Sequence, residues 1–262
     1  MKRILLLALL ILCCLPASAK HRVRLMTYNV GAFGKELDDS APMIARMIAE
    51  LGARTVALNE LDSCNRRHNI NQVQHFADEL NLVAPQRGWS GRFGRAMAYA
   101  GGAYGNGIVT QEKIRDSFSI PLPKEEGSEP RVCVVIETPR YVYAACHLDH
   151  IGEAARRIQA KVITDALQAR YGNSHKPVFL AGDFNDTPDS PVIRQMSHDW
   201  TLLSPLGDSY SAQNPHTCID YIFLLHNRAS VRVTDGAVAT QFSTGDVTVA
   251  SDHLPVFIEV VF

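Results

Sequence analysis

Several short segments of the sequence carry polar side chains where an apolar run ends. The clearest is LAGDFNDTPDSP, in which the run before Gly182 is followed by Asp183 and Asn185. An Asp and an Asn after a glycine are typical of a hydrogen-bonded turn, because their short side chains bond to nearby backbone amides. Carboxylate and amide oxygens are also the ligands that hard divalent cations such as Mg²⁺ prefer. This segment alone therefore leaves a turn and a metal site both open.

Polar residues recur in the same setting along the chain. They are Asn29 in TYNVG, Glu60 in LNELD, His147 and Asp149 in CHLDH, Asp220 in CIDYIFL, and Asp252 and His253 in SDHLP. Asp220 is the most informative, because its neighbours are apolar and a buried carboxylate needs a cation or a hydrogen-bond partner. Histidines beside carboxylates suit the stabilisation or protonation of a phosphoryl oxygen. Each residue alone has a structural explanation, but the set favours one site for phosphoryl chemistry.

Hydrophobic patterning predicts the elements that must position these residues. Strands are expected at 23–28, 55–58, 108–110, 132–136, 141–146, 178–181, 219–225, 230–233 and 255–261. Helices are expected near 43–51, 73–80 and 153–170, the last with Ile158, Val162 and Ala166 on one face, and a further helix should begin at Ser190-Pro191. The glycine-rich stretch 87–107 suggests exposed turns around short strands. Short turns between several strands favour mixed or antiparallel sheets with covering helices over a doubly wound parallel fold.

In their order along the chain, these motifs resemble those of the endonuclease/exonuclease/phosphatase superfamily, over essentially residues 23–262. That group includes pancreatic-type deoxyribonucleases, apurinic endonucleases, neutral sphingomyelinases, deadenylases and inositol polyphosphate 5-phosphatases. The resemblance implies an α/β (α+β) fold, a four-layer α/β/β/α sandwich of two packed mixed sheets flanked by helices. It also implies Mg²⁺- or Mn²⁺-dependent hydrolysis of a phosphoester, at a site on one edge of the sandwich.

The same resemblance implies a role for each motif residue. Glu60 would be the principal metal ligand, helped by Asn29 and Asp252. Asp183 would activate or orient the attacking water, and Asn185 would hold the phosphate. Asp220 would pair with His253. His253 and His147 would stabilise the transition state and help the leaving group. Attack would be in line, without a covalent enzyme intermediate.

Three further residues are candidates for substrate contact, and each has an equally good structural explanation: Asn106 in YGNGIV, Arg66 shortly after Glu60, and Asp149. The substrate class stays open among a nucleic acid, a lipid head group and a small molecule. GDFND also fits a motif of calcineurin-like metallophosphoesterases, but the other motifs of that class do not occur. A 5-phosphatase is disfavoured because no Arg follows Asp220, and a non-catalytic binding module is disfavoured because every core motif position is intact.

The first nineteen residues have the pattern of a secretory signal peptide. Lys2 and Arg3 precede an apolar stretch at 4–15, and Ala17-Ser18-Ala19 is a small-residue cleavage site. A lipoprotein anchor at Cys13 or Cys14 is less favoured, because Leu12 is bulky for a lipidation site. We therefore expect a signal peptide at 1–19 and a single catalytic domain at 20–262, exported to the periplasm or secreted.

Composition limits the partners of the mature chain. Removing Lys2 and Arg3 from the 26 basic residues leaves 24 against 27 acidic residues, a net charge of −3 with neutral histidines. Such a chain has no global attraction for nucleic acid or anionic membranes. No segment after the signal peptide is apolar enough for stable membrane insertion, and we expect a monomer. Export would allow disulfides, with Cys133–Cys146 and Cys64–Cys218 as the candidate pairs and free thiols as the alternative.

Overall fold

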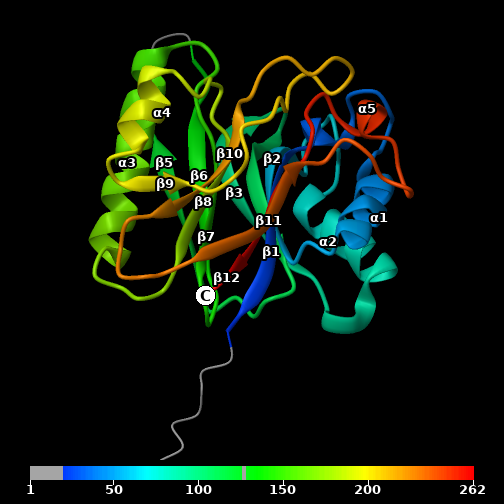
Figure 1. Cartoon of the computed structure of the whole chain (residues 1–262). Coiled ribbons are helices and arrows are strands. Elements are labelled where there is room, and N and C mark those ends of the chain that lie inside the picture. Colours follow the sequence, from blue (N-terminus) through cyan, green and yellow to red (C-terminus); the bar gives the residue numbers. More distant parts are fainter. Residues whose placement is uncertain (1–19, 126–127) are drawn as a thin grey trace, which may run out of the picture.

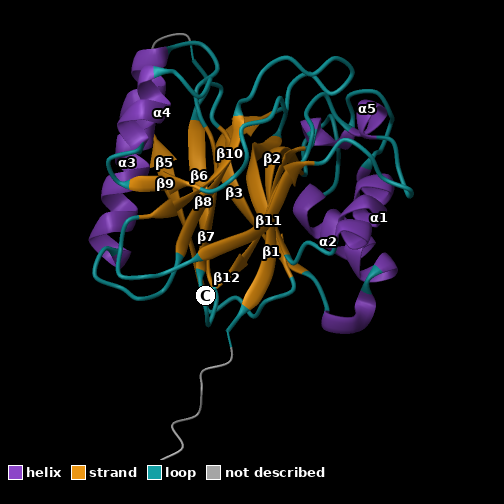
Figure 2. Ribbon diagram, viewed as in Figure 1, coloured by secondary structure: helices purple, strands orange, loops and turns teal. Residues whose placement is uncertain are grey.

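Two six-stranded sheets pack face to face in the computed structural model, which describes residues 20–125 and 128–262 (Figure 1). The first sheet has the strand order β11-β12-β1-β2-β4-β3 and the second has the order β5-β6-β7-β8-β10-β9. Helices α1, α2 and α5 cover the first sheet, whereas α3 and α4 cover the second (Figure 2). The predicted four-layer α/β/β/α sandwich is confirmed.

The first sheet is built from β1 (Arg22–Asn29), β2 (Thr55–Ser63), β3 (Ser90–Tyr99), β4 (Gly102–Thr110), β11 (Arg232–Val238) and β12 (Val256–Val261). The second is built from β5 (Asp116–Leu122), β6 (Arg131–Glu137), β7 (Val142–His147), β8 (Val178–Asp183), β9 (Trp200–Leu202) and β10 (Asp220–Leu225). The helices are α1 (Ala41–Leu51), α2 (Gln72–Val83), α3 (Glu153–Tyr171), α4 (Pro191–Met196) and α5 (Val247–Ala250). Each sheet holds one parallel pair, β1–β2 or β7–β8, among antiparallel neighbours, so both sheets are mixed as predicted.

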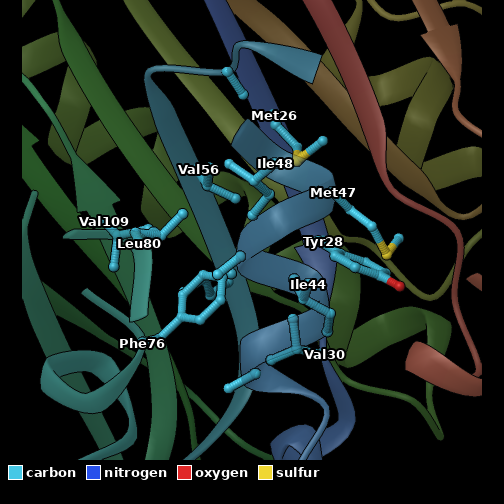
Figure 3. Close-up of a cluster of buried hydrophobic side chains, with 14 of the residues drawn as sticks. Met26, Tyr28, Val30, Ile44, Met47, Ile48, Val56, Phe76, Leu80 and Val109 are labelled. Carbon is cyan, nitrogen blue, oxygen red and sulfur yellow. The ribbon is translucent and has the colours of Figure 1, made fainter. Parts of the chain in front are cut away.

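Helix α1 shows how the outer layers hold the site-bearing strands. Its apolar side chains Ile44 and Ile48 lie against Met26 of β1 and Val56 of β2 in one buried cluster (Figure 3). Full burial of such a side chain is worth about 1.5–3 kcal/mol. The helix ends at Gly52, whose φ of 72° is left-handed, as the sequence pattern predicted. Strands β1 and β2 are therefore fixed from outside by a packed helix.

A second layer, α3 and α4, covers the other sheet. The predicted start of α4 is confirmed, because Ser190 Oγ accepts a hydrogen bond from Ile193 N at 3.2 Å. The predicted face of α3 is confirmed only in part: Val162 and Ala166 are partly buried against the core, whereas Ile158 is 46% exposed. Ile163 and Leu167, which the predicted face did not include, are fully buried.

The glycine-rich stretch is a long hairpin of paired strands. β3 and β4 pair from Ser90–Thr110 to Tyr99–Gly102, with one register shift between Arg95 and Met97. A Cβ on Gly105 would lie 2.0 Å from Gly94 O, so the glycines allow close approach of two strands. The expectation of exposed turns around short strands was therefore wrong here. The structure also contains β5 and β9, which hydrophobic patterning did not predict.

The cysteines of the described residues are free thiols, Cys64 exposed and the other three buried. Cys133 and Cys146, a candidate disulfide pair, are level with each other across β6 and β7, but they are not bonded. The predicted signal peptide and the alternative lipidation site lie outside the described residues. Within those residues, no helix is long and apolar enough to cross a membrane.

Candidate active site

Strand register brings the polar motif residues to one end of the sandwich, opposite the end where β12 reaches the carboxyl terminus (Figure 1). In the parallel pair β1–β2, Asn29 is level with Asn59, and in the parallel pair β7–β8, His147 is level with Asp183. β10 runs antiparallel to β8 and begins at Asp220, directly opposite Asp183. The loop before β12 brings Asp252 and His253 to the same end, because β12 runs antiparallel to β1.

Glu60 reaches this edge through an irregularity in its strand. β2 does not end at Glu60, as the sequence suggested, but continues to Ser63 past a register shift between Leu58 and Leu61. Glu60 lies in this bulge with a φ of 59°, a left-handed conformation that is unfavourable for a residue with a side chain. The side chain accepts a hydrogen bond from Asn29 Nδ2 at 3.0 Å. The strained bulge therefore directs a carboxylate towards the strand ends.

Asp183 is the buried centre of the cluster. Its Oδ2 lies 3.2 Å from Asn29 Nδ2, 3.5 Å from His147 Nε2 and 3.6 Å from His253 Nε2. The residue before it, Gly182, has a φ of 150°, and a Cβ there would lie 1.8 Å from the backbone oxygen of Cys146 in β7. Only glycine therefore allows β8 to approach β7 closely enough to place Asp183 beside His147.

His253 has a second carboxylate on its other side. Its Nδ1 lies 2.8 Å from Asp220 Oδ2, which also accepts a hydrogen bond of 2.7 Å from Ser209 Oγ. The pairing of Asp220 with His253, expected from the resemblance, is present in the structure. The ring of Tyr210 lies 4.9 Å from the His253 ring, centroid to centroid, and both residues line the same cleft.

Burial and charge separate the protonation of these groups. Burial raises the pKa of Asp183 to about 7, although the neighbouring His253 acts in the opposite direction. Burial lowers the pKa of His253, but the carboxylates of Asp220 and Asp183 outweigh it and raise that pKa to about 10. Burial, followed by the charge of Arg131, lowers the pKa of His147 well below its usual value. One histidine is therefore protonated and the other neutral near pH 7.

Two carboxylates converge on a cation beside Asp183. Lys35 Nζ lies 3.0 Å from Asp252 Oδ2 and 3.6 Å from Glu60 Oε2. The lysine stem crosses Gly31, where a Cβ would lie 2.4 Å from Lys35 Cγ. Glu60 and Asp252 thus form an acidic pair that holds a positive charge in this structure.

Asn59 ties the two sheets together beneath the cluster. Its Nδ2 donates to Cys146 O at 2.8 Å and to Asn106 Oδ1 at 3.2 Å, while its Oδ1 accepts a hydrogen bond from Asp183 N at 3.2 Å. The same side chain on β2 therefore contacts β7 and β8 of the other sheet. Asn59 is not among the predicted site residues, because no local signal in LNELD distinguishes it from a turn residue.

Six of the predicted site residues line a cleft of about 400 Å³. Its lining includes the predicted residues Glu60, His147, Asp183, Asn185, Asp252 and His253, and the unpredicted residues Tyr104, Glu129, Arg131, His150, Tyr210 and Ile219. Asn29 and Asp220 lie behind this surface, buried against the lining residues. His150 belongs to the quoted CHLDH motif, so its motif could have indicated it. Arg131 begins the strand beside β7, a neighbour that only the sheet order reveals.

The three candidate substrate contacts lie elsewhere. Asn106 is buried and donates to Val132 O at 2.8 Å, so it supports the strands from behind the cleft. Asp149 is also buried, and its Oδ1 accepts hydrogen bonds from the backbone of the loop that precedes α3. Arg66 lines a separate depression with Cys64 and Asn69. Substrate contact by these residues stays a prediction.

Asn185, by contrast, lies at the cleft itself. Its backbone N–H donates to Asp183 Oδ1 at 2.8 Å, the Asx-type turn that the sequence offered as the simpler explanation. Its side-chain Nδ2 donates to Leu148 O at 3.1 Å, and the side chain also lines the cleft. The turn and a site position are therefore compatible at this residue.

A four-layer sandwich with an acid–histidine cluster at one edge of its sheets is the architecture of the endonuclease/exonuclease/phosphatase fold. The chain belongs to the endonuclease/exonuclease/phosphatase family, whose pattern it matches over residues 26–253. This finding confirms the family that the motifs indicated. A comparison with curated proteins finds no significant match.

Several solved structures share the fold at low sequence identity. An endonuclease/exonuclease/phosphatase from Bacteroides vulgatus is 18% identical, with a TM-score of 0.68 over 92% of this chain and 98% of that chain. A mannosyl-6-phosphatase from Bacteroides thetaiotaomicron is 19% identical, with a TM-score of 0.68 over 92% of this chain and 100% of that chain. The human Nocturnin catalytic domain, with bound sulfate, is 16% identical, with a TM-score of 0.65 over 91% of this chain and 94% of that chain.

Proposed function

We propose that the protein hydrolyses a phosphoester with the help of Mg²⁺ or Mn²⁺, by in-line attack of an activated water. The observation that carries the proposal is the position of Asp183. Its carboxylate is buried between His147 and His253 in a cleft that also contains the acidic pair Glu60 and Asp252. A base, a protonated imidazole and a cation-binding pair within one cleft are the groups that phosphoester hydrolysis requires.

The residues divide the chemistry between them. Asp183 takes a proton from water as the water oxygen bonds to phosphorus, and its pKa of about 7 suits a base that works near neutral pH. The bond from phosphorus to the ester oxygen breaks, and the departing oxygen receives a proton from His253. Asp220 stabilises the protonated form of His253. Asn185 and His147 lie where they can donate hydrogen bonds to the other phosphoryl oxygens.

The donor set fits a divalent cation at the acidic pair. Glu60 and Asp252 already converge on the ammonium of Lys35, which occupies the position that we assign to the metal cation. Two carboxylates that line the cleft are hard oxygen ligands of the kind that Mg²⁺ and Mn²⁺ prefer. When bound, the cation supplies neutralisation of the negative charge on the phosphoryl oxygens. Asn29 accepts a hydrogen bond from Gly31 N on its side-chain oxygen at 3.1 Å, so its role as a ligand is the least supported of the three.

A second group of possible ligands lies deeper. Three possible ligand atoms lie within 4.8 Å of one another, one each from Asp183, Asp220 and His253. His253 Nδ1 is, however, engaged by Asp220, and both acids already have the imidazole as their charge partner. We therefore place the cation at Glu60 and Asp252, and assign the deeper group to proton transfer.

The size of the cleft favours a small-molecule phosphoester, either a diester or a monoester. A volume of about 400 Å³ lies in the usual range of small-molecule sites. Tyr104 and Tyr210 line the cleft with aromatic surface suited to a sugar or a base. A nucleic acid is the second candidate, because the acidic net charge disfavours long polyanions without excluding them. A lipid head group is the third.

A substrate panel tests the proposal. Purified protein would be assayed with Mg²⁺, Mn²⁺ or EDTA on sugar phosphates, p-nitrophenyl phosphate, bis-p-nitrophenyl phosphate, plasmid DNA, RNA and sphingomyelin vesicles. We expect cation-dependent hydrolysis that Asp183→Asn and His253→Ala abolish. Asp165→Asn is the matched control, because Asp165 is exposed on α3 and pairs with Lys161, away from the cleft. If no substrate is cleaved by wild type and spared by the site variants, the proposal fails.

Export is a separate proposal, and it is supported by the pattern of residues 1–19 alone. Cell fractionation followed by amino-terminal sequencing tests it. A mature chain that begins at Lys20 in the periplasm or medium is expected, whereas an intact Met1 in the cytosol contradicts export. Gel filtration of the same material tests the expected monomer.

A further inference from the structure

A buried arginine lies behind two histidines of the cleft. Arg131 begins β6, and its side chain is 4% exposed. Its Nη1 lies 3.1 Å from His147 Nδ1, and its Nη2 lies 3.1 Å from His150 Nδ1. Glu129 is the acidic neighbour of the guanidinium, with 3.6 Å between Oε2 and Nη2. A single side chain thus contacts the Nδ1 atoms of both imidazoles.

The chemistry of the guanidinium fixes the protonation of both rings. Arginine has only N–H donors and stays protonated in proteins. A ring nitrogen that receives a hydrogen bond from it must offer a lone pair, so Nδ1 of His147 and of His150 carries no proton. A neutral imidazole with a bare Nδ1 carries its proton on Nε2. Both histidines are therefore neutral Nε2–H tautomers while the contacts hold.

The surroundings of His147 agree with this protonation. Its Nε2 is the nitrogen that faces the carboxylate of Asp183, at 3.5 Å. The other charged or titratable groups that act on the ring are Arg131 from β6, His150 from the loop after β7, His253 from the loop before β12, and Lys35 from the loop after β1. These four groups lower the pKa of His147, after burial as the main cause. Asp183 is the acid that the ring faces.

We propose that Arg131 is a positioning residue that holds His147 and His150 as neutral imidazoles whose Nε2–H groups donate hydrogen bonds to the phosphoryl oxygens of the substrate. The identity of the acceptor rests on the proposed phosphoester hydrolysis, whereas the tautomers follow from the contacts alone. His147 then donates a hydrogen bond but no proton. Proton donation falls to His253, which differs because two carboxylates face it.

Nuclear magnetic resonance of the metal-free full chain, labelled with ¹⁵N-histidine, tests the inference without turnover. Long-range proton–nitrogen correlations distinguish the two neutral tautomers and the imidazolium. His147→Gln and His150→Gln assign the two signals by their loss. At neutral pH we expect the Nε2–H pattern for both rings. An Nδ1–H pattern or an imidazolium at His147 would overturn the inference.

Variants of Arg131 test whether it acts through the histidines. In Arg131→Met, His147 should lose its single Nε2–H pattern, and kcat should fall by about 10–100-fold, as for other partners that orient catalytic imidazoles. Arg131→Lys keeps a charged donor, so it should retain more of the Nε2–H pattern and more of the kcat than Arg131→Met. Arg22→Met is the control, because Arg22 is exposed and pairs with Glu259 on β12.

The outcomes separate this inference from the proposed function. A fall in kcat while His147 keeps its tautomer in Arg131→Met would mean that Arg131 contacts the substrate directly, which overturns the inference. An Nε2–H pattern in a protein that cleaves nothing would refute the proposed function and leave the assigned tautomers standing. If Arg131→Met fails to fold, the wild-type spectrum still tests the tautomers, and Arg131→Lys still tests whether Arg131 acts through His147.

Discussion

Lys35→Met should strengthen the binding of Mg²⁺ or Mn²⁺. The ammonium lies between the two carboxylates to which we assign the cation, so binding must displace it. Methionine keeps an unbranched stem that can lie over Gly31, and it removes only the charge. The change therefore isolates the competition between a side chain and a metal for Glu60 and Asp252.

The geometry sets the size of the effect. The side chains are partly exposed, 36% for Lys35, 22% for Glu60 and 27% for Asp252, so solvent screens both ion pairs. Pairs of this kind are worth about 0.2–1 kcal/mol each, or roughly 0.4–2 kcal/mol for two. Since about 1.4 kcal/mol is tenfold in affinity, the variant should bind about 2- to 30-fold more tightly.

Titration with Mn²⁺ at physiological ionic strength, followed by electron paramagnetic resonance of the free ion, measures this affinity without any substrate. Lys161→Met is the matched control, because Lys161 is exposed on α3 and pairs with Asp165, away from the cleft. Glu60→Gln should lose most of the binding. Unchanged or weaker affinity in Lys35→Met would refute the idea that Lys35 occupies the cation position.

Three further predictions follow from other contacts. Asp220→Asn should lower the pKa of His253 and reduce hydrolysis by about 10²–10⁴-fold with circular dichroism unchanged; full activity would contradict the pairing. Gly182→Ala should lower the free energy of unfolding by at least about 1–3 kcal/mol, because the new Cβ meets the backbone of β7; an unchanged urea midpoint would contradict this. Burial alone would raise the pKa of Asp62, but hydrogen bonds from Arg67 and from a neighbouring histidine lower it below its usual value. The stability that these bonds provide is present above the unfolded pKa of about 3.9 and is lost as the pH falls below it. Urea titrations at pH 6 and pH 3 should therefore show a smaller drop in the free energy of unfolding for Asp62→Asn than for wild type.

Local patterning predicted most strands and helices, and mixed or antiparallel sheets with covering helices, because each strand-like run is locally apolar and each helix has local start and stop signals. The four-layer sandwich itself was implied by the family resemblance. Asp183 and His147 could be selected by the same local patterning, since each follows such a run directly. Gly182 illustrates the opposite case. Its role is the approach of β8 to β7, a distance that depends on two strands far apart in the sequence.

The parts of the site that the sequence missed depend on strand neighbours. Arg131 lies beside His147 only because β6 pairs with β7, and no local pattern near Arg131 indicates a site. Glu60 was selected as a strand end, but it reaches the cleft by a bulge within a continuing strand. The glycines of β3 and β4 read locally as turns, because close packing of two strands and a tight turn both require glycine.

Asn59 joins the two sheets at the place where each contributes half of the site. Glu60 and Asn29 belong to one sheet, His147 and Asp183 to the other, and the bonds of Asn59 cross between them. Sliding of one sheet over the other by a fraction of an ångström would leave every strand intact and still separate the base from the cation ligands. The protein should therefore inactivate before it unfolds: on warming or in mild urea, hydrolysis should disappear while the circular dichroism of both sheets remains.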